Sequence, residues 1–230
     1  MTLMRFERTP VPGGFILADA ELAPEPGWFD PDFWRARGEG IPLGRGRGVA
    51  VSAGPGGRWV LRHYRRGGLP GRWIADRYVW LGAGRTRPVR ELRVLAELAA
   101  AGAPVPRPVA ARVLRAGMFY RGDLITERVE DARTLADAAR ELPVSRWQDI
   151  GRALRRFHEA GGHHADLNAR NVLLAPSGVF VIDLDRGRRH HGRAARRRNL
   201  ARLERSLRKL RLLPAADAGW QALLAAYTGR

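Results

Sequence analysis

The chain has 230 residues, of which 45% are hydrophobic, and carries 41 basic against 23 acidic side chains, a formal charge of +18. It has no cysteine, which excludes a disulfide framework and a zinc site with thiolate ligands. The positive charge predicts a polyanionic partner: nucleic acid, an anionic membrane surface or a phosphorylated substrate.

No apolar run reaches the roughly 18 residues of a membrane-spanning helix, and the first twenty residues lack the pattern of a secretory signal. We therefore expect a protein that stays in the cytosol. All of its basic residues except Lys209 are arginine, so cationic roles elsewhere in the chain fall to arginine.

The first half of the chain predicts strands with one longer helix. In chain order, the expected elements are an irregular, aromatic-rich arm over 1–40 with a short helix at 29–38, a hairpin around the glycine-rich turn at 53–57, a helix over 87–102, and strands at 109–114 and 119–129. Short apolar runs on either side of glycine and proline indicate the hairpin. Apolar residues that recur every three or four positions indicate the helix.

The second half predicts helices around one small hairpin. The expected elements are a short helix at 134–143, a longer helix at 145–161, strands at 171–174 and 179–182, and a tail helix with leucines at 200, 203, 207 and 210. Ser145 and Gln148 have the spacing of a capping box at the start of the longer helix.

A polar loop in this half carries the residues on which the chemistry depends. Asp166 and Asn171 lie five positions apart, and Asp183 follows the hairpin's second strand. Phosphoryl transfer needs a carboxylate that orients a hydroxyl nucleophile, and amide and carboxylate oxygens that hold magnesium. The runs HADLNARN and VIDLD match the kinase catalytic loop and its later metal-binding motif. We therefore predict an ATP-dependent kinase with Asp166 as catalytic base and Asn171 and Asp183 as Mg²⁺ ligands.

Upstream residues offer partners for the ATP phosphates. Gly44, Gly46 and Gly48 precede a strand, where backbone amides approach phosphates, although the full G-x-G-x-x-G pattern is broken. Arg62 occupies the place of the strand lysine of kinases, and Glu91 in the next helix is its expected partner. Arginine is bulkier than lysine and binds phosphate bidentately, so we expect a somewhat different geometry.

The order of the expected elements predicts an α+β chain, and the resemblance of its motifs to those of kinases implies a protein-kinase-like bilobal fold with a small β-rich N-lobe and a mainly helical C-lobe. We expect the N-lobe over residues 1–128 and the C-lobe over 129–230, with the segment near 127–130 holding adenine. Asp185 stands where kinases have glycine, and no A-P-E motif follows. A protein acceptor is therefore disfavoured, and whether Asp185 shares the metal is left open.

Longer runs carry a closer resemblance. LRHYRRGGL at 61–69, AGAPVPRPVAARV at 101–113, FHEAGGHHADLNARNVLL at 157–174, VFVIDLDRGR at 179–188 and NLARLERSLRK at 199–209 together resemble the bacterial lipopolysaccharide kinase family. The resemblance extends from about residue 13 to the last helix. It implies ATP-dependent phosphorylation of the 4-hydroxyl of 3-deoxy-D-manno-octulosonic acid (Kdo) on lipid A, in lipopolysaccharide core biosynthesis, at the cytoplasmic face of the inner membrane.

Such an acceptor carries phosphates and a sugar carboxylate in a membrane, which suits an arginine-rich, peripheral enzyme on an anionic surface. By position, the candidates for contact with the acceptor are Tyr64, Arg65, Arg66, Arg186 and Arg188. The basic helix over 196–211 either lies on the bilayer or packs its leucines inside the lobe. His164 is expected to support the catalytic loop, and His158 to be a core residue.

Two other functions stay open. A kinase for a soluble acceptor, of the heptose or aminoglycoside type, would keep the same catalytic residues. A non-enzymatic nucleic-acid-binding protein is indicated by charge alone, and the ordered set of Asp166, Asn171 and Asp183 disfavours it, so no nucleic-acid partner is expected. The sequence makes no prediction of the oligomeric state.

Overall fold

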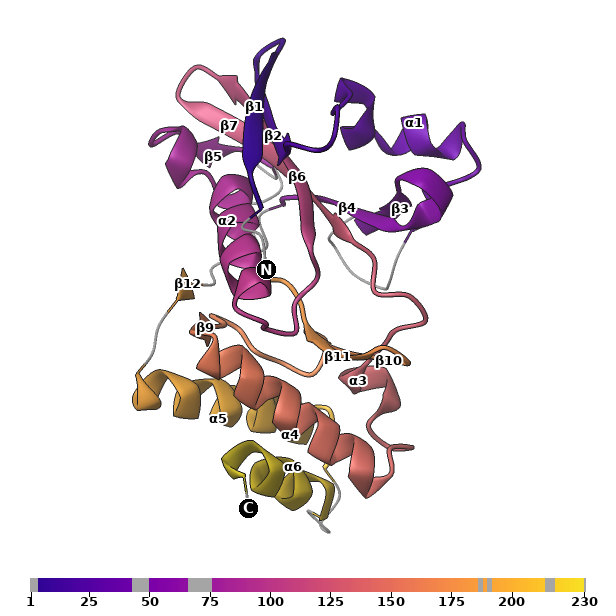
Figure 1. The fold of residues 1–230 in the computed structure, drawn as a ribbon, viewed down its shortest axis with the longest axis vertical. Coiled ribbons are helices and arrows are strands. Elements are labelled where there is room, and N and C mark those ends of the chain that lie inside the picture. The colour runs from indigo at the N-terminus through magenta and orange to yellow at the C-terminus, as the bar shows by residue number, and fades with distance from the viewer. Residues whose placement is uncertain are drawn as a thin grey trace. The chain divides into compact units, whose positions relative to one another are not determined.

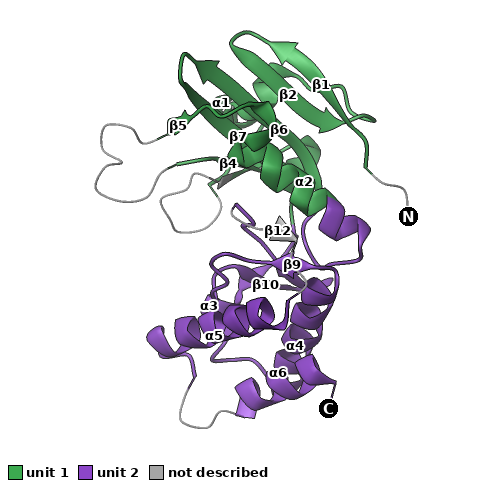
Figure 2. Cartoon of the chain, turned by 90° about the vertical axis from the view of Figure 1, so that its left-hand side faces the viewer, with its two compact units in different colours: residues 1–96, 107–128 green, residues 97–106, 129–230 purple. Residues whose placement is uncertain are grey.

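The computed structural model describes residues 4–42, 50–65, 76–185, 188–189, 192–213 and 218–229 (Figure 1). The chain divides into two units, residues 1–96 with 107–128 and residues 97–106 with 129–230 (Figure 2). The sequence predicts one lobe over residues 1–128, whereas the structure groups residues 97–106 with the second unit.

An antiparallel sheet forms the body of the first unit. In the described residues its strands run in the order β1-β2-β6-β7-β4-β3, with β5 paired to β7. Their bounds are Phe6–Val11 (β1), Gly14–Asp19 (β2), Ala50–Ala53 (β3), Trp59–His63 (β4), Tyr78–Val79 (β5), Pro108–Ala116 (β6) and Phe119–Glu127 (β7). The predicted hairpin is confirmed as β3–β4, which pair around the short 3-10 turn η2 (Pro55–Gly57). The two strands expected after the helix are confirmed as β6 and β7.

The prediction of an irregular arm over residues 1–40 is wrong for Phe6–Asp19, which form the hairpin β1–β2. Gly13, with φ 75°, supplies the left-handed residue of its turn. Strand β2 lies between β1 and β6, and Phe15, Ile16, Leu17 and Ala18 are all buried. A continuous apolar run of this kind lacks the alternation that identifies a half-buried strand.

The remainder of the arm covers part of the sheet with aromatic side chains. It contains the 3-10 turn η1 (Pro26–Phe29) and the short helix α1 (Pro31–Arg35), whose N-cap Asp30 accepts a hydrogen bond from Asp32 N–H. Phe29 and Trp34 are buried in one cluster with Ile16, Val51, Leu61 and Ile125. The arm is therefore part of the hydrophobic core of this unit.

Helix α2 (Arg87–Ala100) follows the 3-10 turn η4 (Ala83–Arg85) and has the predicted apolar face, with Val89, Leu92, Leu95 and Leu98 buried. A Cβ on Gly122 of β7 would stand 2.6 Å from Pro88 Cγ. Glycine at this position therefore allows the start of α2 to approach the sheet closely. Glu91, in the next turn of α2, is buried.

Helices dominate the second unit, together with short strands. The bounds are Arg133–Thr134 (β8), Leu135–Ala138 (α3), Val144–Glu159 (α4), Gly162–His163 (β9), Val172–Ala175 (β10), Gly178–Val181 (β11), Arg188–Arg189 (β12), Arg193–Lys209 (α5) and Ala218–Thr228 (α6). Strands β11, β10 and β8 form one small sheet, and β12 pairs with β9. The expected hairpin is thus confirmed as β10–β11.

Close packing of helices forms the core of this unit. A Cβ on Gly151 of α4 would stand 2.2 Å from the carbonyl oxygen of Leu223 in α6, so the two helices meet at a residue without a side chain. Phe157, Leu203 and Leu207 are fully buried. The predicted capping box at Ser145 is wrong, because α4 begins one residue earlier, after Pro143, whose side chain makes no capping bond.

Candidate active site

The predicted catalytic loop lies between β9 and β10 and is held by its own polar groups. The backbone carbonyl of Asp166 accepts hydrogen bonds from Asn171 Nδ2 at 3.0 Å and from Asn168 Nδ2 at 3.1 Å. The backbone N–H of Asp166 donates to His164 Nδ1 at 3.0 Å. The Asp166 residue is exposed. The loop is therefore closed through its backbone, while the one carboxylate in it is accessible to a substrate.

Ile182 connects this loop to Asp183. The backbone N–H of Ile182 donates to the carbonyl of Asn171 at 3.0 Å, and its carbonyl accepts from His164 Nε2 at 2.9 Å. Asp183 comes next and has φ 62°, a left-handed conformation that aspartate tolerates better than most residues and that clusters at functional sites. The structure thus brings together Asp166, Asn171 and Asp183 through backbone bonds on both sides of Ile182.

These contacts define the protonation state of His164, which has the supporting role expected of it. Nδ1 accepts the Asp166 N–H, so the ring proton must be on Nε2, which donates to the Ile182 carbonyl. The buried ring is therefore neutral and links the base-bearing loop to the segment before Asp183. A second proton on Nδ1 would break the bond to Asp166.

Helix α5 supplies a second layer of support that the sequence analysis missed. Asn199, which is fully buried, binds the backbone of His164 on both sides: Oδ1 accepts its N–H at 3.0 Å, and Nδ2 donates to its carbonyl at 2.7 Å. One and two turns on, Arg202 donates to the Ala165 carbonyl at 2.5 Å and Ser206 Oγ accepts the Ala169 N–H at 3.2 Å.

A signal for Asn199 was present in the sequence. The buried positions of α5 are Ala195, Asn199, Leu203 and Leu207, which step by four. An asparagine in an apolar stripe is costly unless its amide is fully bonded. Of the leucines expected to form the stripe, Leu203 and Leu207 are buried inside the unit. This face of α5 packs in the protein and is not available to a bilayer.

His158 completes the support from behind Asn199. Its Nε2 lies 3.2 Å from Asn199 Oδ1 and its Nδ1 lies 2.9 Å from Tyr227 Oη. Because Asn199 Oδ1 can only accept, Nε2 carries the proton and Nδ1 accepts from the tyrosine hydroxyl. Burial lowers the pKa of His158 from 6.5 to about 4, so the ring is neutral near pH 7. His158 is thus the core residue that was expected.

The donor chemistry of the loop suits a magnesium ion. Asn171 uses Nδ2 for the Asp166 carbonyl, which leaves Oδ1 as its acceptor atom, and Asp183 adds an exposed carboxylate. Among the described residues, no group of three His, Cys, Asp or Glu side chains is placed to hold a metal ion. One amide and one carboxylate match the way in which Mg²⁺ is bound by few protein ligands, with phosphates and water completing the shell.

In the first unit, the structure brings together Arg62 of β4 and Glu91 of α2. Arg62 Nη2 lies 2.5 Å from Glu91 Oε1, and the Glu91 side chain is 1% exposed. Tyr64 donates its hydroxyl proton to Glu91 Oε2. The proposal that Tyr64 contacts the acceptor is wrong, because this residue is buried, with 4% exposure, in the contact with Glu91. Arg65 is exposed.

Other predicted residues lie outside the described part of the chain. These are Gly44, Gly46 and Gly48 of the glycine-rich loop, Arg66, Arg186 and the side chain of Arg188. Within the described ranges, every helix is too short or too polar to cross a membrane.

Comparisons with known proteins agree on one family. The model of the "Lipopolysaccharide kinase (Kdo/WaaP) family" matches residues 31–227. A 3-deoxy-D-manno-octulosonic acid kinase of Xanthomonas campestris pv. campestris (strain B100) is 47% identical over 206 residues, which cover 86% of this chain and 82% of the relative. The enzyme of that name from Stenotrophomonas maltophilia (strain K279a) is 45% identical over 210 residues, with coverage of 86% and 82%.

A solved structure shares the fold. The structure described as "WaaP in complex with acyl carrier protein" has a TM-score of 0.56 and 17% sequence identity, and the match covers 82% of this chain and 78% of that one. The expected α+β, kinase-like fold is thereby confirmed. The family resemblance seen in the sequence is confirmed as well: the chain belongs to the lipopolysaccharide kinase (Kdo/WaaP) family.

Proposed function

We propose that this protein is a Kdo kinase that transfers the γ-phosphoryl group of ATP to the 4-hydroxyl of Kdo attached to lipid A, in lipopolysaccharide core biosynthesis. Curated relatives at 45% and 47% identity carry the name of this enzyme. The observation that carries the proposal is the loop in which Asp166, Asn171 and Asp183 are joined through the backbone of Ile182. This is the set of oxygen donors that phosphoryl transfer requires.

Asp166 is the proposed base. Its backbone is bonded to His164 and Asn171. The carboxylate accepts one long bond, from Asn168 Nδ2 to Oδ2 at 3.4 Å, and a carboxylate has further acceptor sites for a substrate hydroxyl. It accepts a hydrogen bond from the acceptor hydroxyl and then its proton, as the acceptor oxygen bonds to the γ-phosphorus and the bond from that phosphorus to the β,γ-bridging oxygen of ADP breaks. Positioning and charge neutralisation carry the reaction, and no covalent enzyme intermediate is needed.

Asn171 and Asp183 are the proposed Mg²⁺ ligands, through the amide Oδ1 and the carboxylate. The metal neutralises charge on the phosphates when bound. The left-handed backbone at Asp183, together with the two bonds to Ile182, determines where this carboxylate is presented. Whether Asp185 adds a third oxygen is not needed for the proposal.

Arg62 is the proposed phosphate-binding cation of the first unit, with Glu91 as its anchor. Glu91 is held by both Arg62 and Tyr64, so the carboxylate orients the guanidinium from behind. The Arg62 side chain is 24% exposed and also donates from Nη2 to Tyr64 Oη at 3.3 Å, and a guanidinium can bind phosphate bidentately. Gly44, Gly46 and Gly48 are proposed to cover the phosphates, and the segment near 127–130 to hold adenine.

The acceptor places the enzyme on the cytoplasmic face of the inner membrane as a peripheral protein. Kdo-linked lipid A combines anionic groups with acyl chains, and the charge of +18 favours a negatively charged lipid surface. The proposed membrane contact is therefore electrostatic and does not use a membrane-spanning helix.

An acceptor panel with radiolabelled ATP tests the proposal. We expect label on Kdo-lipid A, and only when Mg²⁺ is present. Label only on a heptose or an aminoglycoside would show that the acceptor is a different sugar. No label on any acceptor would contradict the assignment of kinase activity. Asp166→Asn keeps the size of the side chain and the backbone bonds but removes the base, so transfer should fall by about 10²–10⁴-fold while nucleotide binding persists. Asp149→Asn, which weakens the ion pairs of a half-buried α4 carboxylate with Arg146 and Arg152 and leaves the loop residues unchanged, is the matched control and should keep full activity.

A further inference from the structure

Arg202 of helix α5 stands next to the proposed base. Its Nη1 donates to the carbonyl oxygen of Ala165 at 2.5 Å, and this carbonyl belongs to the peptide bond that joins Ala165 to Asp166. The guanidinium is therefore held one residue away from the carboxylate that receives the acceptor proton. All three residues lie in the second unit.

The Arg202 guanidinium has N–H donors to spare. A guanidinium carries five of them, and the contact with Ala165 is made through Nη1 alone. The one carboxylate of α5, that of Glu204, is bound to Arg208 at 2.9 Å, and no carboxylate in the described part of the chain pairs with Arg202. The residue is half-buried. A partly buried charge without a counter-ion costs free energy, which a bound anion offsets.

Two further arginines extend the positive charge along the same side of α5. Arg198 precedes Arg202 by one helical turn and Arg205 follows it by one, spacings that place side chains on one face of a helix. Both are exposed, and within the described ranges neither forms an ion pair with a carboxylate. Arg202 thus lies at the border between the catalytic loop and a positive surface without counter-ions.

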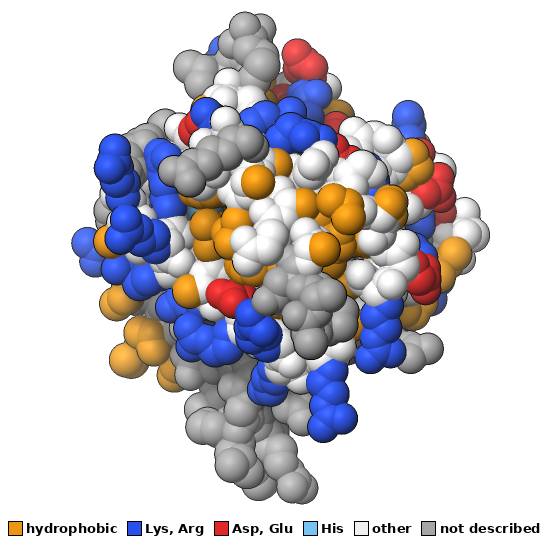
Figure 3. Space-filling model, turned by 90° about the horizontal axis from the view of Figure 1, so that it is seen from below, with side chains coloured by type: hydrophobic (Ala, Val, Ile, Leu, Met, Phe, Trp, Pro, Cys, Tyr) orange, Lys and Arg blue, Asp and Glu red, His pale blue; other side chains and the backbone are white. Residues whose placement is uncertain are grey.

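Arginines elsewhere in this unit differ in being paired. Figure 3 shows one face of the molecule, on which lysine and arginine side chains surround an apolar centre. On helix α4, Arg146 and Arg152 are bound to Asp149, and Arg155 is bound to Glu159. An arginine that already has a carboxylate partner is less suited to bind a substrate anion than Arg202 is.

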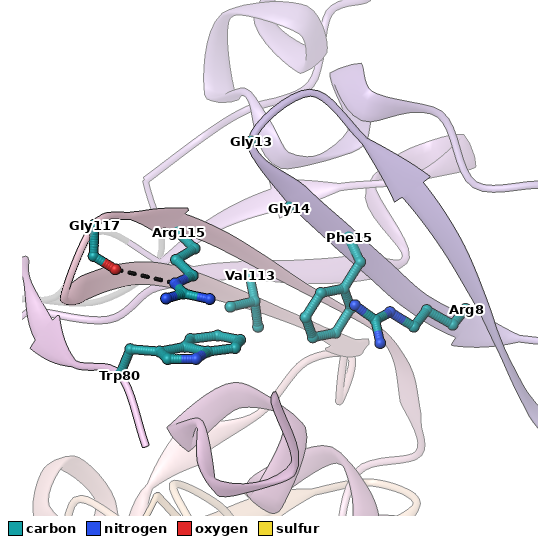
Figure 4. Close-up of a pocket in the computed structure, with 8 residues that line it drawn as sticks. All are labelled: Arg8, Gly13, Gly14, Phe15, Trp80, Val113, Arg115 and Gly117. Carbon is teal, nitrogen blue, oxygen red and sulfur yellow. Dashed lines mark hydrogen bonds between the residues drawn. The ribbon is translucent and has the colours of Figure 1, made fainter. Parts of the chain in front are cut away.

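The first unit has two exposed arginines at a hollow of about 440 Å³ (Figure 4). The guanidinium of Arg115 lies 5.0 Å from the centroid of the Trp80 ring, and that of Arg8 lies 4.0 Å from the centroid of the Phe15 ring. None of the residues proposed for catalysis is among the described residues that line this hollow. An anion bound there would not be placed by the catalytic loop.

The proposed acceptor carries an anion close to its reacting hydroxyl. Kdo is a 3-deoxy-2-octulosonic acid, so C1 is a carboxylate on the anomeric carbon C2, C3 is a methylene, and C4 bears the hydroxyl that receives the phosphoryl group. The carboxylate and this hydroxyl are therefore attached to ring carbons that are separated by a single methylene group. A guanidinium fork matches the two oxygens of a carboxylate. Neighbouring groups of the sugar thus correspond to the neighbouring Arg202 and Asp166.

We propose that Arg202 binds the carboxylate of the Kdo residue to be phosphorylated and so determines the preference of the enzyme for an acidic sugar. The inference rests on the proposed function, whose acceptor supplies the carboxylate. With that group on Arg202, the sugar presents its 4-hydroxyl to Asp166. A heptose lacks the anion, and an aminoglycoside would bring ammonium groups to a positive surface. Arg198 and Arg205 attract the anionic acceptor by their charge.

Acceptors with and without the carboxylate test the proposal. Kdo-lipid A is compared in detergent with its C1 carboxamide, which keeps the size of the group and removes its charge. We expect kcat/KM of the wild-type enzyme to favour the carboxylate by about 10–100-fold, the range for a hydrogen bond to a charged group. Arg202→Gln keeps an N–H donor for Ala165 but removes the charge, so the preference should fall to about threefold or less. Arg202→Lys keeps the charge without the fork and should have an intermediate preference.

Arg208→Gln is the matched control. Arg208 lies on the same helix but is bound to Glu204, so this variant should keep the wild-type preference. Circular dichroism checks that each variant is folded, and if Arg202→Gln does not fold, the preferences of the wild type and of Arg202→Lys decide.

Three outcomes overturn the proposal. An equal loss on both acceptors in Arg202→Gln would show that the arginine only holds the loop through Ala165. A wild-type enzyme without a preference would show that the carboxylate is not bound. Kdo-lipid A without its lipid A phosphates tests the other anions of the acceptor: if Arg202→Gln slows only the phosphorylated form, Arg202 binds a phosphate instead. No transfer to Kdo-lipid A by the wild type rejects the proposed function itself.

Discussion

Asn199→Ala is the most informative single change in the second unit. It removes the side chain that bonds the N–H and the carbonyl of His164 and also the Nε2 of His158. His164 in turn bonds the backbone of Asp166 and the residue before Asp183. The substitution therefore releases the catalytic loop without touching a residue that contacts substrate.

The size of the expected loss in stability follows from the polar groups that Asn199→Ala leaves without a partner. A buried polar group that loses its partner costs about 1–3 kcal/mol, and three such groups would be left in a site where Asn199 is fully buried. Water that enters the vacated space restores part of the bonding. We expect the free energy of unfolding to fall by about 3–5 kcal/mol, and kcat to fall by about 10²-fold, the cost of a misplacement of about 1 Å at a reacting group.

Leu203→Ala provides the matched control. This leucine is the next buried residue on the same stripe of α5 and should cost a similar 2–5 kcal/mol, roughly, through the cavity it leaves, but it makes no polar contact with the loop among those described. Both variants are assayed for kcat and KM well below their unfolding temperatures, and urea unfolding gives the stability. If Asn199→Ala keeps the kcat of Leu203→Ala, the positioning role is refuted and the asparagine is only structural.

Three further predictions concern other contacts. Arg62→Met leaves the buried Glu91 carboxylate without its cation, so unfolding free energy should fall by about 3 kcal/mol in urea titrations, whereas Arg62→Lys should recover most of it; equal losses would contradict the ion-pair argument. His158 stays neutral in the folded state down to about pH 4, while the unfolded chain takes up the proton below about pH 6.5. Stability should therefore decline by up to about 3 kcal/mol as pH falls through that window, and the decline should vanish in His158→Phe; an identical pH profile in the variant would exclude this histidine as the cause. Gly151→Ala places a Cβ 2.2 Å from the Leu223 carbonyl oxygen, so α6 must shift at a cost of about 1–3 kcal/mol, visible as a lower Tm by calorimetry; an unchanged Tm would show that the two helices separate freely.

Local patterns made parts of the fold predictable. The Ala-Gly-Pro-Gly-Gly turn at 53–57 and the apolar spacing over 87–102 each depend on neighbouring residues, and both elements form where they were expected. The β1–β2 hairpin was not predicted, because the burial of β2 comes from β6, a strand about ninety residues later in the chain. Helix α4 starts at Val144, one residue before the predicted range, with Pro143 as an N-cap that makes no side-chain bond, a difference of the size usual at helix ends.

The candidate site divides in the same way. The spacing of Asp166, Asn171 and Asp183, the absence of lysine before Lys209 and the family-specific runs are properties of the sequence by itself, and they determined the class of chemistry and the residues proposed for it. Only the tertiary structure decided that Tyr64 is buried against Glu91. It also decided that α5 holds the catalytic loop, through Asn199, Arg202 and Ser206. The physical reason is distance along the chain. The residues that a reaction requires occur at short, fixed spacings in the sequence. The partner of a buried polar group and the exposure of an apolar side chain depend instead on packing between segments tens of residues apart.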